Sequence, residues 1–301
     1  MIDYRCLTGN CIPENHKGTA GDFYTKEILK GILKDGCLDQ NPRPKYSDGT
    51  PAHTLSYNHG MCSYDLTKGE SPLVTLRPIA VKSAIGELLW IYQDASNDLD
   101  VLKDKYGVTW WDEWALPGTR NIGPVYGGTV GPRHLMEKLL DGMQKDPDGR
   151  RHIISLWQES DFEKPHGLKP CAFLTQFNIR HGKDGIDYLD MCLTQRSSDF
   201  ATAGCINQTQ YMVLLHLVAR HLGLTPGRFT WFYNNIQIYD RHIDNVNIML
   251  NREGIDCKPE IWLNPDKKNF YDFTMDDIKV VGYPRKKVLE KNPQLKFDLG
   301  I

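Results

Sequence analysis

Apolar side chains recur at intervals of three and four residues in several stretches of the chain. Residues 21–33 show this pattern, which predicts an amphipathic helix. A broader apolar face follows Pro78, and because proline is favoured in the first turn of a helix, we predict that a long helix begins there. Two further helices are predicted, at residues 133–144 and at residues 206–224, the second ended by Gly223 and a Pro226-Gly227 turn.

A second set of segments is rich in β-branched and aromatic residues with alternating polarity. These segments predict strands at residues 152–158, 172–180, 188–195 and 229–239. Residues 40–51 are rich in turn formers and predict an exposed loop. In the C-terminal third we expect short strands and loops, with packed turns at residues 261–265 and 270–273.

Helices and strands therefore mix without regular βαβ alternation. This order favours an α+β fold with a mixed, mainly antiparallel sheet covered by helices. No repeat, low-complexity tract or linker divides the 301 residues, so we expect residues 1–301 to form a single large domain.

Charge and cysteine usage narrow the class of protein. The 36 Lys and Arg against 38 Asp and Glu give a net charge of −2, which argues against a nucleic-acid or membrane-surface binder. No apolar run is long enough to span a membrane and the N-terminus lacks an apolar signal core, so we expect a cytoplasmic protein. The 8 cysteines form no CxxC pair, which predicts reduced thiols and no metal site.

One of those cysteines has a distinctive setting. Cys171 follows Pro170 at the start of a predicted strand, and Arg196 and Ser197 follow the next predicted strand. If these strands are neighbours, Arg196 lies beside the sulfur and its charge lowers the thiol pKa. A nucleophile close to an anion-binding arginine suggests covalent chemistry on a phosphorylated substrate.

Further arginines are available for a phosphate group. Arg43 lies in the predicted loop, and Arg150 and Arg151 follow the turn-forming sequence of residues 146–149. Guanidinium groups match phosphate oxygens in pairs. A single arginine is more often a solvated surface cation, and the sequence alone does not bring the four together.

Many short motifs then occur in a recognisable order. They are Ser47–Thr54, Gly86–Trp90, Trp111–Trp114, Gly123–Gly127, Arg150–Ile153, Lys169–Cys171, Gln195–Asp199, Asn207 and Ile238–His242. From about Gln40 to the C-terminus, the chain resembles the folate-dependent thymidylate synthase family. The resemblance implies a sheet-to-sheet homodimer that methylates dUMP with 5,10-methylenetetrahydrofolate as co-substrate, giving dTMP and dihydrofolate.

The resemblance also implies roles for individual residues. Cys171 matches the nucleophile that adds to C6 of uracil, and the other residues matched to catalysis are Glu87, Tyr126, Arg196 and Asp199. Nucleotide binding is implied for Arg43, Arg150, Arg151, Gln195, Arg196, Ser197, Ser198, Asn207, Gln237 and Tyr239. Folate binding is implied for Trp111, Asp199 and Ile301.

Two of these roles have a wider consequence. Arg150 and Arg151 match a pair that one subunit contributes to the site of the other, so a monomer is expected to be nearly inactive. The end of the chain, residues 297–301, resembles a short hydrophobic tail that closes over the folate. RNA is expected as a partner only in autoregulation.

The chain departs from the family pattern at three places. Ala172 replaces the histidine that most often follows the nucleophile, and residues 203–205 replace the usual Gly-x-Pro. Gln237 replaces a histidine that contacts the sugar 3′-hydroxyl, so selectivity for deoxyribose over ribose is open.

Two alternatives remain beside the synthase. One is a pyrimidine nucleotide 5-hydroxymethylase on the same fold, in which water captures the methylene intermediate. The other is a non-catalytic paralogue that binds nucleotide or RNA. Asn207, whose amide suits the edge of uracil, and Trp111 favour the synthase.

Overall fold

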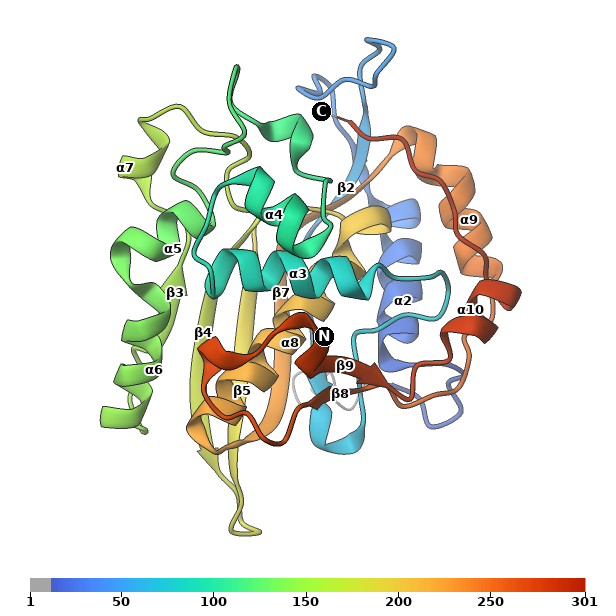
Figure 1. Cartoon of the computed structure of the whole chain (residues 1–301). Coiled ribbons are helices and arrows are strands. Elements are labelled where there is room, and N and C mark those ends of the chain that lie inside the picture. The colour runs from blue at the N-terminus through green and yellow to red at the C-terminus, as the bar shows by residue number, and fades with distance from the viewer. Residues whose placement is uncertain (1–11, 301) are drawn as a thin grey trace.

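A seven-stranded sheet runs through the protein, whose computed structural model describes residues 12–300 (Figure 1). The strand order is β1-β2-β7-β5-β4-β3, with β6 paired to β7 beside this path. The strands are β1 Cys37–Leu38, β2 Thr54–Asp65, β3 Ile153–Ser155, β4 Ala172–His181, β5 Asp187–Gln195, β6 Ser198–Asp199 and β7 Thr225–Tyr239, and a separate pair is β8 Glu260–Leu263 and β9 Ile278–Val281. Only the β5–β7 and β6–β7 pairs of the large sheet are parallel, which confirms the predicted mixed, mainly antiparallel α+β fold.

Helices lie in front of the strands in the view of Figure 1. They are α2 Ala20–Asp35, α3 Val81–Tyr92, α4 Leu99–Tyr106, α5 Gly127–Arg133, α6 Leu135–Lys145, α7 Glu159–Phe162, α8 Cys205–Leu222, α9 Ile243–Asn251 and α10 Arg285–Lys291. Five short 3₁₀ turns and one π-helical turn complete the described elements: η1 Leu66–Lys68, η2 Asp112–Trp114, η3 Phe200–Gly204 (the π turn), η4 Asp240–His242, η5 Phe270–Asp272 and η6 Met275–Asp277.

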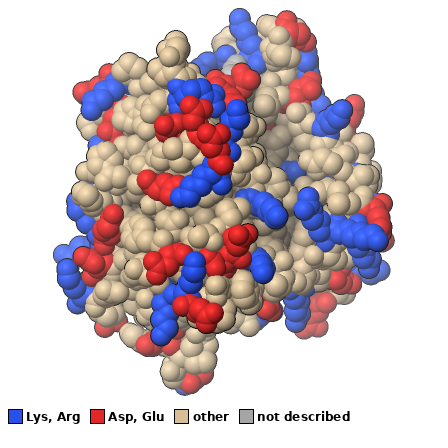
Figure 2. Space-filling model, viewed as in Figure 1, with Lys and Arg blue, Asp and Glu red and all other residues tan. Residues whose placement is uncertain are grey.

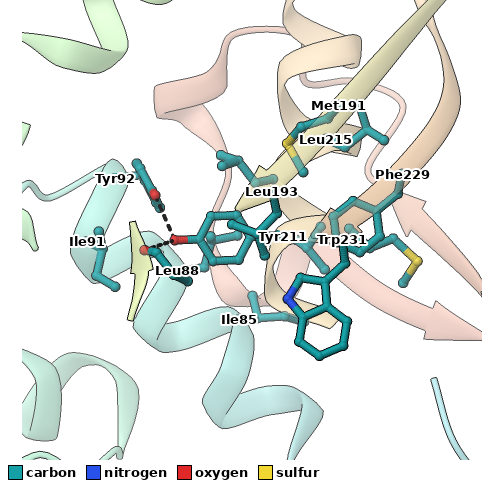
Figure 3. Packing of buried hydrophobic residues seen from close by; sticks show 14 of the residues in the cluster. Ile85, Leu88, Ile91, Tyr92, Met191, Leu193, Tyr211, Leu215, Phe229 and Trp231 are labelled. Carbon is teal, nitrogen blue, oxygen red and sulfur yellow. Dashed lines mark hydrogen bonds between the residues drawn. The ribbon is translucent and has the colours of Figure 1, made fainter. Parts of the chain in front are cut away.

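The main core forms where α8 packs between α3 and the sheet. Figure 3 shows Leu88 of α3, Leu215 of α8 and Trp231 of β7 in this cluster, and each is almost fully buried. One hydrogen bond drawn there joins the hydroxyls of Tyr92 and Tyr211 at 2.9 Å, and the Tyr211 hydroxyl also lies 3.3 Å from the Ala172 carbonyl. The bond between the two hydroxyls gives both buried phenols a partner, which removes the cost of leaving them unpaired.

The strands present a second, less buried face. Along the middle of β7, buried residues alternate with more accessible ones, as expected for a strand with one face on a core. Phe232 on that second face is 40% exposed, and Ile153 of β3 is 44% exposed. Large apolar side chains on an accessible sheet face are characteristic of surfaces that another chain covers.

Two features of the strands differ from the sequence prediction. The twelve-residue strand β2 was not predicted, because its middle carries polar residues and Gly60. Gly60 is required there by packing, since a Cβ atom would lie 2.1 Å from the hydroxyl of Tyr233 on the neighbouring strand. The predicted turn at residues 226–227 is wrong: both residues belong to β7, and Gly227 allows close approach to Asp190.

The predicted packed turn at residues 261–265 is also wrong in part. Residues 260–263 form strand β8, which pairs with β9 in antiparallel register. Helices α9 and α10 complete this C-terminal third, where we predicted only strands and loops.

Helix boundaries differ at two places. The helix expected from Pro78 begins at Val81, because the Ile79 carbonyl accepts the Val81 N–H in a tight turn first. The helix expected over residues 133–144 begins instead at Leu135. His134, at φ 53°, is left-handed and ends α5 before α6 starts.

Acidic and basic side chains are interspersed over the face shown in Figure 2. This mixture agrees with the near-zero net charge of the sequence. Among residues 12–300, no helix is long and apolar enough to cross a bilayer.

Candidate active site

The register of two strands brings Cys171 and Arg196 together. Ala172 pairs with Gln195 at the ends of β4 and β5, and the Arg196 N–H donates to the Cys171 carbonyl at 2.9 Å. The ladder therefore continues one step past both strands. Arg196 Nη2 lies 3.5 Å from Cys171 Sγ, as the sequence predicted for neighbouring strands.

Backbone carbonyls hold the guanidinium of Arg196 in place. Its Nε donates to Pro170 O at 2.9 Å and its Nη2 to Lys169 O at 2.8 Å, and it lies over the ring of Trp157. Nη1 has no hydrogen-bond partner within residues 12–300 and is free for an anion. The planar guanidinium can bind the backbone carbonyls through Nε and Nη2 while Nη1 points elsewhere.

The expected effect of Arg196 on the thiol needs correction. Burial raises the pKa of the Cys171 thiol, and the positive charge of Arg196 only partly offsets this. Removing a thiolate from water is costly, and one cation does not compensate here. In this state the thiol is therefore less acidic than a free cysteine, although the predicted cation is beside it.

Tyr126 lies against the backbone of Cys171. Its hydroxyl accepts the Cys171 N–H at 3.2 Å, and its ring is buried beside Trp111 at 4.8 Å. Tyr126 precedes α5 with φ 51° and ψ −114°, a conformation that L residues rarely adopt. Such backbone strain is concentrated at functional positions. Burial, reinforced by the nearby thiol, raises the tyrosine pKa well above its ordinary value.

Glu87 is a buried carboxylate on the apolar helix α3, with 7% of its surface exposed. The indole N–H of Trp110 donates to Glu87 Oε2. Burial raises the pKa of Glu87, and the nearby donors Gln210 and Trp110 oppose the shift. A carboxyl group in such a site can hold a proton closer to neutral pH than a surface glutamate.

Three side-chain amides form a chain from the sheet to α8. Gln195 Nε2 donates to Asn207 Oδ1 at 3.0 Å, and Asn207 Nδ2 donates to Gln210 Oε1 at 3.1 Å. Gln195 Oε1 is fixed in turn by the Trp231 indole at 2.9 Å. These bonds fix which end of each amide faces the site, while Asn207 keeps one donor and one acceptor site for a ligand.

Further predicted nucleotide-binding residues lie on the adjoining strands. Ser197 and Gln237 exchange a hydrogen bond at 3.3 to 3.5 Å, and the β6–β7 register pairs Gln237 with Asp199. Burial, with the Asp199 charge, raises the pKa of Tyr239 to about 12, and exposed Arg43 is near enough to oppose it. The thiol of Cys171 contributes to the same field, so these groups share one region.

Two residues predicted to bind folate each have a buried polar atom with no hydrogen bond of good geometry among residues 12–300. They are Asp199 Oδ1 and Trp111 Nε1, and the Trp111 indole is still near enough to Glu87 to oppose the rise in the pKa of that carboxyl group. Unpaired buried donors and acceptors are uncommon and costly. A pteridine ring carries N–H and ring-nitrogen groups that could complete them, so these residues fit the expected co-substrate. Ile301, the third predicted folate contact, lies outside the described residues.

Not every predicted residue joins this site. Arg150 and Arg151 are exposed, and the Arg151 side chain forms an ion pair with Asp146 at 3.8 Å. Ser198 is buried, and its hydroxyl has no hydrogen-bond partner among the described residues.

The structure adds residues that the sequence interpretation did not select. Trp110 contacts Glu87, and Gln210 contacts Asn207. Trp231 contacts Gln195, and His242 contacts Asp199. Only Gln210 had a local signal, since it lies three residues after Asn207 on one helix face. The other three come from segments whose neighbours are set by the tertiary fold.

Comparison with known proteins decides the family. The sequence profile described as thymidylate synthase matches residues 24–294. The chain belongs to the thymidylate synthase family. The match begins ahead of Gln40, within α2, and ends just before the C-terminal tail.

Individual thymidylate synthases are similar along nearly the whole chain. The one from Streptococcus pneumoniae (strain 70585) is 46% identical over 284 residues, which cover 94% of this chain and 100% of that protein. The one from Lactococcus lactis subsp. lactis (strain IL1403) is 45% identical over the same length and coverage. The solved structure of thermostable thymidylate synthase A from Bacillus subtilis superposes with a TM-score of 0.84 at 34% identity, covering 93% of this chain and 99% of that one.

These similarities confirm the predicted family and the predicted enzyme class, a methyltransferase. Neither the hydroxymethylase nor the non-catalytic paralogue receives support from them. The roles of individual residues in this thymidylate synthase family member stay predictions.

Proposed function

We propose that this enzyme converts dUMP and 5,10-methylenetetrahydrofolate into dTMP and dihydrofolate, with Cys171 as the nucleophile. The observation that carries the proposal is the 3.5 Å contact between Arg196 Nη2 and Cys171 Sγ, next to an amide network suited to uracil. A thiol and an anion-binding guanidinium in contact fit covalent chemistry on a nucleotide monophosphate.

In the proposed first step, the Cys171 thiolate forms a bond to C6 of uracil. The C5–C6 π electrons move toward O4 as an enolate, so C5 becomes a nucleophile. Burial disfavours the thiolate of Cys171 before the nucleotide binds. We therefore infer that the thiol is still protonated when the dianionic nucleotide enters the site. The thiol loses its proton to solvent water after the nucleotide has bound, and Arg196 stabilises the thiolate that then attacks C6.

We assign reading of the base to Asn207. Its remaining amide N–H can donate to O4, and its remaining carbonyl lone pair can accept from N3–H of uracil. Gln195 and Gln210 hold the amide in this orientation through its other donor and acceptor. A flipped amide would lose both bonds, so the network favours uracil over cytosine.

We assign the folate side to Trp111, Asp199 and the C-terminal residue Ile301, with Glu87 and Tyr126 handling protons between the two substrates. Methylenetetrahydrofolate supplies the one-carbon unit and the hydride. Glu87 can hold a proton to higher pH than an exposed glutamate, because burial raises its pKa. Tyr126 can act in removal of the C5 proton, since its hydroxyl lies within hydrogen-bond distance of the Cys171 backbone.

We further propose a homodimer that covers the accessible face of the sheet and shares its sites. The exposed apolar residues Ile153 and Phe232 support such an interface. Arg150 and Arg151 are exposed and lie apart from Cys171 of their own chain. We propose that they bind the phosphate in the site of the partner subunit. Arg43, Arg196 and Ser197 would bind the same phosphate from the chain that supplies the thiol. We place the enzyme in the cytoplasm, with residues 1–301 as one catalytic domain.

One assay tests the reaction. The protein is incubated with dUMP and methylenetetrahydrofolate while dihydrofolate absorbance is followed and the pyrimidine product is identified by mass. We expect dTMP and dihydrofolate in equal amounts from the wild type and none from Cys171→Ala. Hydroxymethyl-dUMP with tetrahydrofolate would establish the hydroxymethylase instead. No turnover in either protein would indicate a binding paralogue.

The same assay with UMP tests the sugar pocket. Gln237 stands where related enzymes usually have histidine, and it bonds to Ser197 in this chain. We expect UMP to react at least tenfold less efficiently than dUMP, because an amide fixed by Ser197 leaves little freedom to accept a second hydroxyl. Equal efficiency would show that Gln237 does not select the sugar.

A further inference from the structure

His242 is a buried histidine just outside the residues assigned above. It ends the turn η4 that follows β7, and none of its surface is exposed. Its ring packs between Tyr239 at 5.2 Å and Phe297 at 5.0 Å, in edge-to-face contact with both. The ring therefore touches a strand of the active site and the C-terminal tail at the same time.

The two ring nitrogens face different partners. Nε2 lies 2.7 Å from the Asp298 carbonyl, which can only accept, so Nε2 carries a proton. Nδ1 lies 3.7 Å from Asp199 Oδ1. Neither His242 Nδ1 nor Asp199 Oδ1 has a closer partner in residues 12–300, although both atoms are buried. The other oxygen of Asp199 accepts from Thr202 at 2.5 Å.

The tail is docked along the same side of the molecule. The Gly300 carbonyl accepts from the Tyr239 hydroxyl at 3.3 Å, and the Lys296 carbonyl accepts from Asn245 at 2.5 Å. A side chain at Gly300 would collide with Tyr239, so the tail lies directly on this ring. His242 both hydrogen-bonds the tail, at the Asp298 carbonyl, and lies 3.7 Å from an Asp199 oxygen.

We propose that His242 is a positioning residue that couples the folate-side carboxylate of Asp199 to docking of the C-terminal tail. The inference rests on the proposed function, in which Asp199 binds the pteridine. Shortening the Nδ1–Oδ1 distance by about 0.8 Å gives an ordinary charge-assisted hydrogen bond. The same carboxylate oxygen has a second lone pair for a pteridine N–H. A ligand that fixes Asp199 thereby fixes the imidazole, which in turn holds the tail carbonyl.

The charges around the ring support this role. The Asp199 carboxylate and the Asp298 carbonyl face the ring, and both residues favour the imidazolium form, Asp298 also through its charge. They raise the His242 pKa despite burial, which acts in the opposite direction. The buried cation Arg77, whose guanidinium lies over the Phe297 ring, balances part of the Asp199 charge. An imidazolium donates from both nitrogens, and oxygens face both.

Coupling of this kind is reciprocal: folate should stabilise the docked tail, and the docked tail should strengthen folate binding. The tail position is measurable because trypsin cleavage after Lys296 removes residues 297–301, which intact mass identifies. Dihydrofolate with dUMP is a suitable probe, since this pair cannot turn over. In the wild type, we expect the probe to slow this cleavage about tenfold compared with dUMP alone.

Two substitutions separate the contacts. His242→Phe keeps the aromatic packing and removes both N–H groups. His242→Gln places an amide donor near the Nε2 position, so it can keep the tail carbonyl but not the link to Asp199. In both variants we expect dihydrofolate to leave the cleavage rate unchanged within twofold. The KM for methylenetetrahydrofolate should rise about tenfold, and the Kd of dUMP should change less than twofold.

A matched control is His221→Asn, which removes an imidazole that accepts the Phe270 N–H away from this site. It should lower thermal stability without changing folate protection of the tail. If dihydrofolate still protects the tail in His242→Gln and the folate KM is unchanged, the coupling role is wrong. That result is distinct from failure of the proposed function, in which the wild type itself makes no dTMP.

Discussion

The Cys171 thiol lies between two opposing influences. Burial raises its pKa, and Arg196 at 3.5 Å lowers it. The sequence predicted the neighbour correctly, because adjacent strand ends meet at one edge of a sheet. It could not predict the balance, since burial depends on segments such as Trp157 that pack over the site from elsewhere.

Arg196→Met isolates the contribution of that charge. Without the guanidinium, only the burial effect remains, so the thiol pKa rises further. We expect the pH profile of Cys171 alkylation by iodoacetamide to move upward by about one unit, or roughly 1.4 kcal/mol. Peptide mass spectrometry reports Cys171 separately from the other cysteines.

The matched control is Arg180→Met, at the opposite end of β4, where the arginine pairs with Asp190 at 2.8 Å. Its alkylation profile should coincide with that of the wild type. An unchanged profile in Arg196→Met would mean that Arg196 does not stabilise the thiolate.

Glu87→Gln tests the buried carboxyl group through stability. Because burial raises its pKa in the folded state, the folded protein binds more protons than the unfolded one between the two pKa values. Its contribution to stability therefore falls as pH rises from about 4.5 through the folded-state value. Glutamine has no such proton and still accepts from Trp110.

Urea unfolding at pH 4.5, 6 and 8 measures this difference. We expect the free energy of unfolding of Glu87→Gln, relative to the wild type, to increase with pH by about 1–2 kcal/mol, while kcat falls at least a hundredfold. A relative stability that does not change with pH would rule out a raised Glu87 pKa. Gain of stability with loss of activity is the usual pattern for a buried functional charge.

At the scale of elements, local pattern predicts well where one periodicity dominates. Helices α2 and α8 and strands β4 and β5 were predicted close to their observed bounds, whereas β7 begins four residues before its predicted start. Strand β2 was not predicted, because it contains Gly60, which weakens a strand pattern and is needed for contact with Tyr233. That need is created by a strand far away in the sequence.

The break between α5 and α6 was missed for a similar reason. Nothing in the composition of residues 133–144 indicates that His134 adopts φ 53°. We expect His134→Gly to raise the free energy of unfolding by about 0.5–1 kcal/mol, because relief of left-handed strain exceeds the added chain entropy of glycine. His134→Val should lower it by about 1 kcal/mol or more, since β-branched residues avoid this conformation. Urea titration measures both, and a less stable glycine variant would mean that the exposed histidine makes a contact worth more than the strain.

At the scale of the whole molecule, the described chain brings together most of the proposed site but not the proposed phosphate clamp. Arg196 and Ser197 lie beside Cys171, whereas Arg150 and Arg151 point to no group of their own site within hydrogen-bond distance. The family resemblance predicted that Arg150 and Arg151 act in the site of the partner subunit. The residues of a single sequence give no physical reason to expect this. A shared site follows only if two copies place the accessible faces of their sheets together.

Mixing two inactive variants decides whether the site is shared. Cys171→Ala lacks the nucleophile, and the double variant Arg150→Ala with Arg151→Ala lacks the proposed clamp. If the arginines act across the interface, a hybrid dimer contains one complete site, built from Cys171 of one chain and the arginines of the other. Random reassortment should then restore about a quarter of wild-type activity.

The opposite arrangement gives a different result. If each chain supplies its own arginines, both sites of every hybrid lack either the thiol or the clamp, and mixing restores nothing. Activity is measured after joint unfolding and refolding, with each variant refolded alone as the control. The recovered activity should also fall on dilution below the dimer dissociation constant, because the restored site exists only while two chains are joined.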